Sequence, residues 1–373
     1  MTDKQGAAEA KFERLIGFLD QDPANLALAT DCAEVALDAG RFSIARDILA
    51  PFERDGRIDA RGRNIAGLAA MRGGDQDAAQ RIFAALLSDH PDDAAVRFNL
   101  AWSRTLADDH AGAREALGDA TGSDMPQAAM LDLQIHHHLG EFDEAEAKLD
   151  RYVARFPDYP PLQAAASVLA MDLDRPDLAR HCAEKGGEHP DALSTLGVIE
   201  LGDQRADAAR ALFVRSLDTK PNNPRANIGL GLVELGAGNS RDALALLDRG
   251  AEQFGDHLGS WVAAGWAHLL ASDTVAARAR FERALAIDDS FGEAQGSLAA
   301  LDALAGDFES ARRRTEVALR LDRQSFSAAF ASAIIAAADG DETKAQRIFE
   351  IAARQPLTPD GRTLAELLAG MAL

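Results

Sequence analysis

Three consecutive histidines, His136, His137 and His138, are the residues whose type most directly suggests chemistry in this chain. Imidazole nitrogens are common zinc ligands, and zinc sites on helices place two histidines about one turn apart. Consecutive residues on a helix instead point about 100° apart, so three in a row cannot converge on one ion. The other histidines show no ligand spacing either. We therefore expect no metal site.

Catalysis and cofactor binding leave recognisable motifs, and none of them occurs here. The chain has no G-x-S-x-G nucleophile motif, no phosphate loop of the G-x4-G-K-[ST] type, and no G-x-G-x-x-G after a strand. We interpret Gly229-Leu230-Gly231 as a helix-packing feature, and the pairs Asp108-Asp109 and Asp288-Asp289 as helix caps in turns. The sequence thus predicts no catalytic residue and no cofactor, and we expect that the protein is not an enzyme.

The elements that would position any site follow a repeat of about 34 residues. In its clearest copy, Trp261, Gly265, Ala277, Phe281 and Ala284 are spaced W-x3-G and then A-x3-F-x2-A. Seven of the nine intervals between equivalent alanines are 34 residues long, and the residue twelve positions before each alanine is small in nine of ten copies. The repeat alanines are Ala45, Ala79, Ala113, Ala145, Ala179, Ala209, Ala243, Ala277, Ala311 and Ala345. Turns between the two helices of a copy are predicted at Gly40, Gly74, Asp108, Gly140, Asp174, Gly238, Gly306 and Gly340.

This pattern resembles the tetratricopeptide repeat, a helix-turn-helix unit of about 34 residues. The two helices of such a unit lie antiparallel, and small residues such as Gly265 and Ala277 let their backbones approach closely. The resemblance implies an all-α fold, a right-handed superhelical solenoid of about ten repeats with capping helices at both ends. Each repeat would contact mainly its neighbours.

We expect four segments along the chain. Residues 1–24 would form an N-terminal capping helix, residues 25–190 repeats one to five, residues 191–357 repeats six to ten, and residues 358–373 a C-terminal capping helix. The fifth repeat is the weakest, because its interval is four residues short and its second helix runs into Gly186-Gly187. Two interpretations remain open: a boundary between two lobes, or a degenerate repeat within one continuous superhelix.

The candidate binding residues follow from the resemblance. In this family the first helices of successive units line a concave groove that binds extended or helical peptides, and positions eight, eleven and fifteen before each repeat alanine should face it. Those positions are unusually apolar here. The alternative is that some of these side chains pack between neighbouring first helices. The predicted partner-binding residues are Leu68, Met71, Phe98, Trp102, Met130, Gln134, His137, Leu232, Leu235, Val262, Trp266, Leu269, Phe330 and Ile334.

Charge and composition exclude several classes of partner. The formal net charge is −21, from 60 acidic and 39 basic residues, which opposes nucleic-acid binding. No apolar run approaches the roughly 18 residues of a membrane span, and Met1 to Asp22 lack the apolar core of a signal peptide. Cys32 and Cys182 do not suggest a disulfide framework. We therefore expect no nucleic acid, no membrane insertion and a cytoplasmic location.

The function that these observations favour is a non-enzymatic adaptor or assembly factor. It would hold a segment of a partner protein, such as an amphipathic helix, in its apolar groove. One alternative is a scaffold that assembles with copies of itself. Another is an accessory subunit of an enzyme complex, for example in envelope or polysaccharide assembly.

Overall fold

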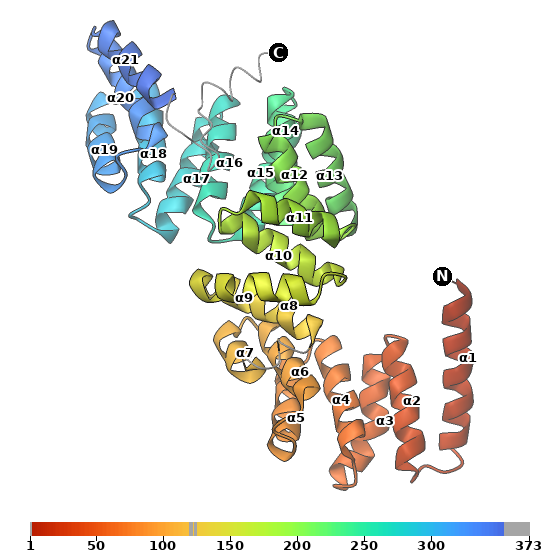
Figure 1. Cartoon of the computed structure of the whole chain (residues 1–373). Helices are drawn as coiled ribbons and strands as arrows, with labels where there is room; N and C mark the ends of the chain where they lie inside the picture. The colour runs from red at the N-terminus through yellow and green to blue at the C-terminus, as the bar shows by residue number, and fades with distance from the viewer. Residues whose placement is uncertain (1, 119–121, 123–124, 354–373) are drawn as a thin grey trace. The chain divides into compact units, whose positions relative to one another are not determined.

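The computed structural model describes residues 2–118, 122 and 125–353, and this part of the chain contains 21 helices and no strand (Figure 1). Helix α1 (Thr2–Leu19) precedes ten consecutive helix pairs. The first helices of the pairs are α2 (Leu26–Asp38), α4 (Ala60–Arg72), α6 (Ala94–Thr105), α8 (Pro126–His138), α10 (Pro160–Asp172), α12 (Pro190–Gly202), α14 (Pro224–Gly236), α16 (Leu258–Leu270), α18 (Gly292–Leu304) and α20 (Phe326–Ala338). The second helices are α3 (Phe42–Arg54), α5 (Gln76–Asp89), α7 (His110–Leu117), α9 (Phe142–Arg155), α11 (Pro176–Gly186), α13 (Ala206–Thr219), α15 (Ser240–Phe254), α17 (Thr274–Ile287), α19 (Phe308–Leu321) and α21 (Glu342–Ala353).

Many of the helices begin at a residue that satisfies or removes their free backbone N–H groups. Asp109 caps α7 by accepting a hydrogen bond from the Gly112 N–H at 2.9 Å, and Asp273 and Asp307 cap α17 and α19 in the same way. Asp288 accepts from the Ser290 N–H at 2.9 Å in the turn before α18. Helices α8, α10, α11, α12 and α14 begin at a proline. The interpretation of Asp108-Asp109 as a turn and capping pair is confirmed, whereas Asp288 accepts a hydrogen bond within the turn and α18 has Phe291 at its N-cap, without a side-chain cap.

The turn within every helix pair uses the same backbone conformation. The residue five positions before each repeat alanine has a positive φ in all ten pairs, and the eight turn residues predicted from the sequence are among them. The other two are Gln204, with φ 61°, and Ser272, with φ 64°. A side chain in this left-handed region is costly, which explains why glycine and aspartate fill most of the turns.

The two helices of a pair meet at the repeat positions. Nine of the ten repeat alanines, Ala45 to Ala311, are completely buried. The small residue twelve positions earlier faces the large residue four positions later: a Cβ added to Gly197 would lie 2.5 Å from the Phe213 ring, and one added to Gly231 would lie 2.7 Å from Leu247. Gly229, of the next first helix, faces the same Phe213 ring. The register of the repeat and the packing role of Gly229-Leu230-Gly231 are confirmed.

The chain divides into two compact units, the first ending at Ala166 and the second beginning at Ser167, within α10. The sequence suggested a division after residue 190 instead, and the four expected segments remain a prediction. At the N-terminus α1 packs on α2, with Phe12 buried between them. The predicted C-terminal capping helix, residues 358–373, lies outside the described residues.

Candidate functional site: the wall of first helices

Within each unit, several successive first helices contact one another. Helix α2 contacts α4 and α4 contacts α6 in the first unit, while α12 contacts α14 and α18 contacts both α16 and α20 in the second. Successive second helices make no comparable contact in the described part of the chain. Helices that touch lie on the inner side of a curved stack, and helices that splay apart lie on its outer side. We call the surface formed by the first helices the first-helix wall.

In the first unit, the apolar residues predicted for the wall gather over α4 and α6. The rings of Phe98 and Trp102 lie 5.9 Å apart, and both side chains pack with Leu68 against the core around the buried Met71. All three are half-buried. The Trp102 indole N–H has no hydrogen-bond partner in the described residues, so a bound segment could accept a hydrogen bond from it.

Helix α8 contributes three further predicted residues, Met130, Gln134 and His137, and all are half-buried. The His137 ring lies 5.9 Å from Phe142 and 6.0 Å from His138, at the end of α8 and the start of α9. His137 therefore takes part in an aromatic group at the turn.

In the second unit, Trp266 is the centre of the wall. Its ring lies 6.0 Å from Phe281 of its own pair and 5.8 Å from Phe330 of α20, and its indole N–H donates a hydrogen bond to Ser297 Oγ of α18 at 3.0 Å. Trp266 thus ties three first helices together while remaining half-buried. Phe326, one turn before Phe330, stacks on it at 6.3 Å. Phe326 was not among the residues predicted from the sequence, although its i, i+4 spacing from Phe330 is a visible signal.

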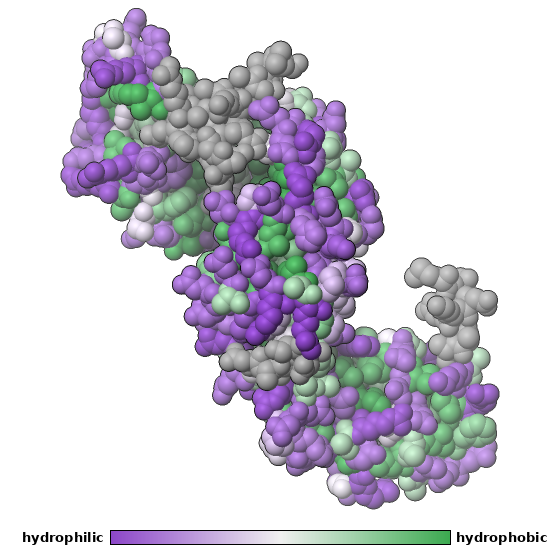
Figure 2. All heavy atoms as spheres, viewed as in Figure 1, coloured by the Kyte–Doolittle hydropathy of each residue, from purple (hydrophilic) through white to green (hydrophobic). Residues whose placement is uncertain are grey.

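The remaining predicted residues differ in exposure. Leu235, Leu269 and Ile334 are half-buried against their neighbours. Met71 and Val262 are only 8% exposed, so they pack between helices, whereas Leu232 is 39% exposed. Figure 2 shows hydrophobic side chains between hydrophilic ones over α2 to α4 and over α16 to α20. The wall is therefore partly open and partly core.

The charged side chains on the first helices of the second unit are bonded within the protein. An arginine directly after a repeat alanine reaches an acid on the next first helix: Arg180 bonds Glu200 at 3.1 Å, Arg210 bonds Glu234, and Arg278 bonds Asp302 at 2.5 Å. These ion pairs join successive repeats. They also direct the acids Glu200, Glu234 and Asp302 toward the second helices.

A buried polar network lies between α8 and α9. Asp132 and His136, each 4% exposed, meet Lys148 and Tyr152: the Tyr152 hydroxyl donates to Asp132 at 2.7 Å, and Lys148 donates to Asp132 at 3.1 Å. Burial favours the neutral Asp132 acid, but the hydrogen bonds from His136, Tyr152 and Lys148 outweigh it and lower the pKa of Asp132. Burial also raises the pKa of Tyr152. The network is inward-facing and closed, so it stabilises the helix pair.

The protonation of His136 follows from its neighbours. Its hydrogen bond with Asp132 raises the pKa of His136 and thereby favours the cation. The Lys148 ammonium, however, lies 2.9 Å from His136 Nε2, a contact that two cations would not hold. At Nε2 the ring therefore has two competing partners: when protonated it donates to Asp132, 3.3 Å away, and when neutral it accepts from Lys148, while Nδ1 donates to Glu141 at 2.7 Å in both forms.

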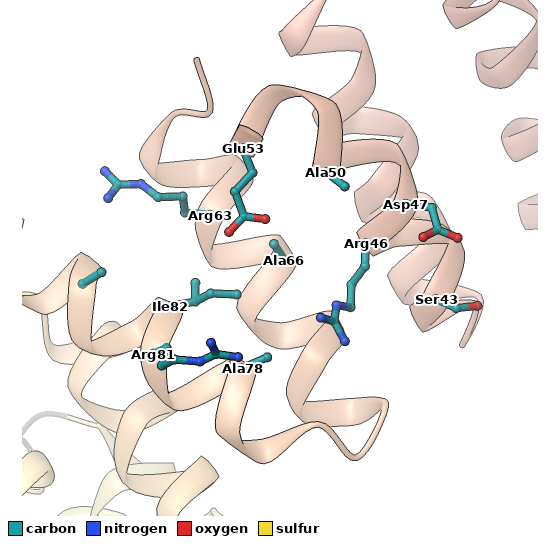
Figure 3. A pocket seen from close by; sticks show the side chains of 11 residues that line it. Ser43, Arg46, Asp47, Ala50, Glu53, Arg63, Ala66, Ala78, Arg81 and Ile82 are labelled. Carbon is teal, nitrogen blue, oxygen red and sulfur yellow. The ribbon is translucent and has the colours of Figure 1, made fainter. Parts of the chain in front are cut away.

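Two clefts lie away from the wall, at equivalent places between successive second helices. One, of about 490 Å³, is lined by α3, α4 and α5, with Arg46, Arg63, Arg81 and Glu53 around Ala66 (Figure 3). The other lies between α19 and α21 over α20. Two arginines of the first cleft are matched by acids, since Arg46 bonds Asp75 and Arg63 bonds Asp89, each at 2.8 Å. Their mixed charge gives no clear ligand preference.

The described residues form neither a metal site nor a membrane-spanning helix. No three His, Cys, Asp or Glu side chains lie together as metal ligands there. Among the described helices, none combines the length and apolar character that crossing a membrane requires.

Comparisons with known proteins agree with this architecture. Models described as tetratricopeptide repeat match residues 66–125, 107–160 and 200–264. The chain is similar to the solved structures "Human IFIT1 dimer with m7Gppp-AAAA" (12% identity, 95% of each chain covered, TM-score 0.53) and "IFIT1 monomeric mutant (L457E/L464E) with Gppp-AAAA" (12% identity, 95% of each chain covered, TM-score 0.52). At this identity the likeness shows the fold alone. No match was found among the curated proteins.

Proposed function

The chain belongs to the tetratricopeptide repeat family, and from this premise we propose that it is a non-enzymatic adaptor or assembly factor that binds a segment of a partner protein on its first-helix wall. The observation that carries the proposal is the set of half-buried apolar side chains on the first helices, Phe98 and Trp102 of α6 in one unit and Trp266 of α16 with Phe330 of α20 in the other. Tryptophan is a frequent anchor in protein interfaces, because it buries a large area.

An amphipathic helix suits such a wall. Apolar side chains at i, i+3 and i+4 of a partner helix would pack between the half-buried side chains of successive first helices. Glu200, Glu234 and Asp302 of the second unit's first helices are already bonded to arginines, so they do not oppose the burial of an apolar strip. Binding would therefore depend on apolar anchors.

Substitution of the two tryptophans tests the proposal. Immobilised wild-type protein and the variants Trp102→Ala and Trp266→Ala are incubated with native lysate, and retained proteins are quantified by mass spectrometry. For the proteins that the wild type retains, we expect each variant to weaken the binding free energy by about 2 kcal/mol or more. Val214→Ala, at a 42% exposed position on the second helix α13, is the matched control and should retain them.

Stability is measured on the same variants to separate binding from folding. Trp266→Ala removes the hydrogen bond to Ser297 and two ring contacts, so it should lower the melting temperature more than Trp102→Ala does. The comparison at Trp102 is therefore the cleaner one. If folded Trp102→Ala and folded Trp266→Ala both retain the same proteins as the wild type, the wall is not the binding surface.

A further inference from the structure

The part of the wall formed by α16, α18 and α20 differs from the rest in its charge. Helices α16 and α20 contain no Asp, Glu, Lys or Arg, and α18 contains only Glu293 and Asp302. Glu293 is bonded to Ser325 at 2.6 Å, and Asp302 is bonded to Arg278 and Arg314. The wall here is apolar and holds no basic residue. In contrast, α4 and α6 of the first unit contain five arginines.

The loops at both ends of these three helices are acidic. Loops 255–257, 271–273, 288–291, 305–307, 322–325 and 339–341 contain eight aspartates, one arginine, Arg323, and His257, whose pKa is lowered by burial. Hydrogen bonds from Ser290 lower the pKa of Asp288, those from Ser310 lower the pKa of Asp307, and the one from Arg312 lowers the pKa of Asp339, so these carboxylates are ionised at neutral pH. An apolar wall is thus bordered by negative charge on two sides.

The dimensions fit a helix lying across the wall. A first helix of 13 residues is about 20 Å long, and a helix with its side chains is about 10 Å wide. Roughly 5 Å then remains on each flank, a distance that the four-carbon stem of a lysine can span. Cations on both flanks of the partner helix would reach the acidic loops while its apolar strip faces Trp266, Leu269 and Phe330.

We propose that α16, α18 and α20 form the docking site for a basic amphipathic helix of a partner protein, with its apolar strip on the wall and its lysines or arginines at the aspartate-bearing loops. This inference rests on the proposed function and adds the chemistry of the partner. The first unit, whose wall carries arginines, is not the site. A second copy of this chain fits poorly, since its net charge is −21.

Matched peptides test the charge requirement. The probe is a fluorescein-labelled amphipathic peptide of leucine and lysine, about five helical turns long, and its partner carries glutamate in place of every lysine. Binding to the full chain is followed by fluorescence anisotropy at about 0.05 M and about 0.3 M salt. We expect the lysine peptide to bind at least about tenfold more tightly than the glutamate peptide, and to weaken at the higher salt concentration.

Variants then locate the binding. Asp273, Asp307 and Asp341 cap helices beside the wall, and asparagine caps a helix about as well as aspartate. The triple change to asparagine should lower the affinity for the lysine peptide about fivefold. The control makes the same change at three caps of the first unit, Asp59, Asp93 and Asp109. It removes equal charge and should change the affinity less than twofold. Phe330→Ser or Leu269→Gln, checked for folding by circular dichroism, should weaken it at least about tenfold.

The outcomes separate this inference from the proposed function. Equal binding of both peptides, lost with Phe330→Ser, overturns the charge requirement but leaves a protein-binding wall. If Phe330→Ser binds the lysine peptide as tightly as the wild type does, the peptide adsorbs to acidic surface elsewhere. The proposed docking site on α16, α18 and α20 is then wrong. Absence of binding by either peptide also overturns it, and the lysate experiment then decides the function alone. A concentration-dependent dimer that Phe330→Ser dissolves, measured by light scattering, would make a second copy the occupant.

Discussion

Glycine on a first helix lets the two helices of a pair approach closely, because it has no side chain. Gly265 of α16 faces the ring of Phe281 on α17, and Phe281 is fully buried. Gly197 and Gly231 have the same relation to Phe213 and Leu247. A large residue four positions after the repeat alanine thus fills the space that the small residue leaves open. This complementarity is a property of single residues.

Gly265→Leu should therefore overpack the α16–α17 contact and lower the free energy of unfolding by about 1–3 kcal/mol. Denaturant melts measure the change. Gly17→Leu is the control: a Cβ added to Gly17, on α1, meets no atom within 4 Å, so stability should be unchanged or slightly higher. Unchanged stability of Gly265→Leu would refute the packing register.

At the scale of single elements, each helix pair has its own turn residue with a left-handed backbone. All ten turns require a left-handed residue, yet Gln204 and Ser272 supply it in place of glycine or aspartate. These two turns were not predicted from the sequence, because neither glutamine nor serine marks such a turn. The fold imposes the left-handed conformation on Gln204 and Ser272, because the chain must turn at the same position in every helix pair.

Gln204→Gly and Ser272→Gly should each raise the free energy of unfolding by up to about 1 kcal/mol. Relief of the left-handed strain, about 1–2 kcal/mol, exceeds the entropy cost of a glycine. Gly238→Ser, at an equivalent turn with φ 81°, is the reverse control and should be destabilising. A destabilised Gln204→Gly would mean that its side chain contributes more than its strained backbone costs.

The cap of α12 should make stability depend on pH. His189 Nδ1 accepts a hydrogen bond from the Asp191 N–H at 3.3 Å, which requires the neutral ring. Burial lowers the pKa of His189 below its usual value of 6.5. The unfolded chain therefore takes up the proton first, so the stabilisation is fully present above about pH 6.5 and is lost as pH falls through the lowered folded-state pKa.

His189→Asn keeps a capping side chain that does not titrate. The fall in melting temperature between about pH 7.5 and about pH 5 should be smaller in this variant than in the wild type, with the cap itself contributing about 1 kcal/mol. His181→Asn, at an exposed position on the neighbouring α11, is the control for the substitution itself. An identical fall in the wild type and His189→Asn would show that the cap does not respond to pH.

On the scale of the whole molecule, stability should vary along the array. The stretch Lys185 to Pro190 joins α11 to α12 in the shortest repeat, and Gly187 ends α11 with φ 58°. A short connection with two glycines orders few contacts, and such segments open at low free energy.

Hydrogen exchange should find amides 185–190 exchanging before those in the turns of repeats seven to ten. Limited proteolysis should cut in the same place. The division into compact units falls at Ala166 and Ser167 instead, so exchange across α10 is measured in the same experiment. If amides 185–190 are as well protected from exchange as the turns of repeats seven to ten, the prediction that the array opens most easily at this segment is wrong.

The sequence by itself determined the repeat register, the all-helical fold and most of the turns. These depend on local rules: a helix of 3.6 residues per turn, a small residue at each close crossing, and glycine or aspartate in a left-handed turn. The first-helix positions expected to face a groove followed from the same register. Ten buried or half-buried repeat alanines could therefore be placed from spacing alone.

Only the tertiary structure decided which wall residues are accessible. Met71 and Val262 are buried while Leu232 is exposed, although all three are apolar residues at positions of the repeat that were predicted to face a groove. Exposure depends on the side chains that neighbouring helices bring, such as Phe330 beside Trp266, 64 positions further along the chain. The inter-repeat ion pairs, such as Arg210 with Glu234, were likewise invisible to periodicity. Such contacts are non-local, because each repeat is completed by the next.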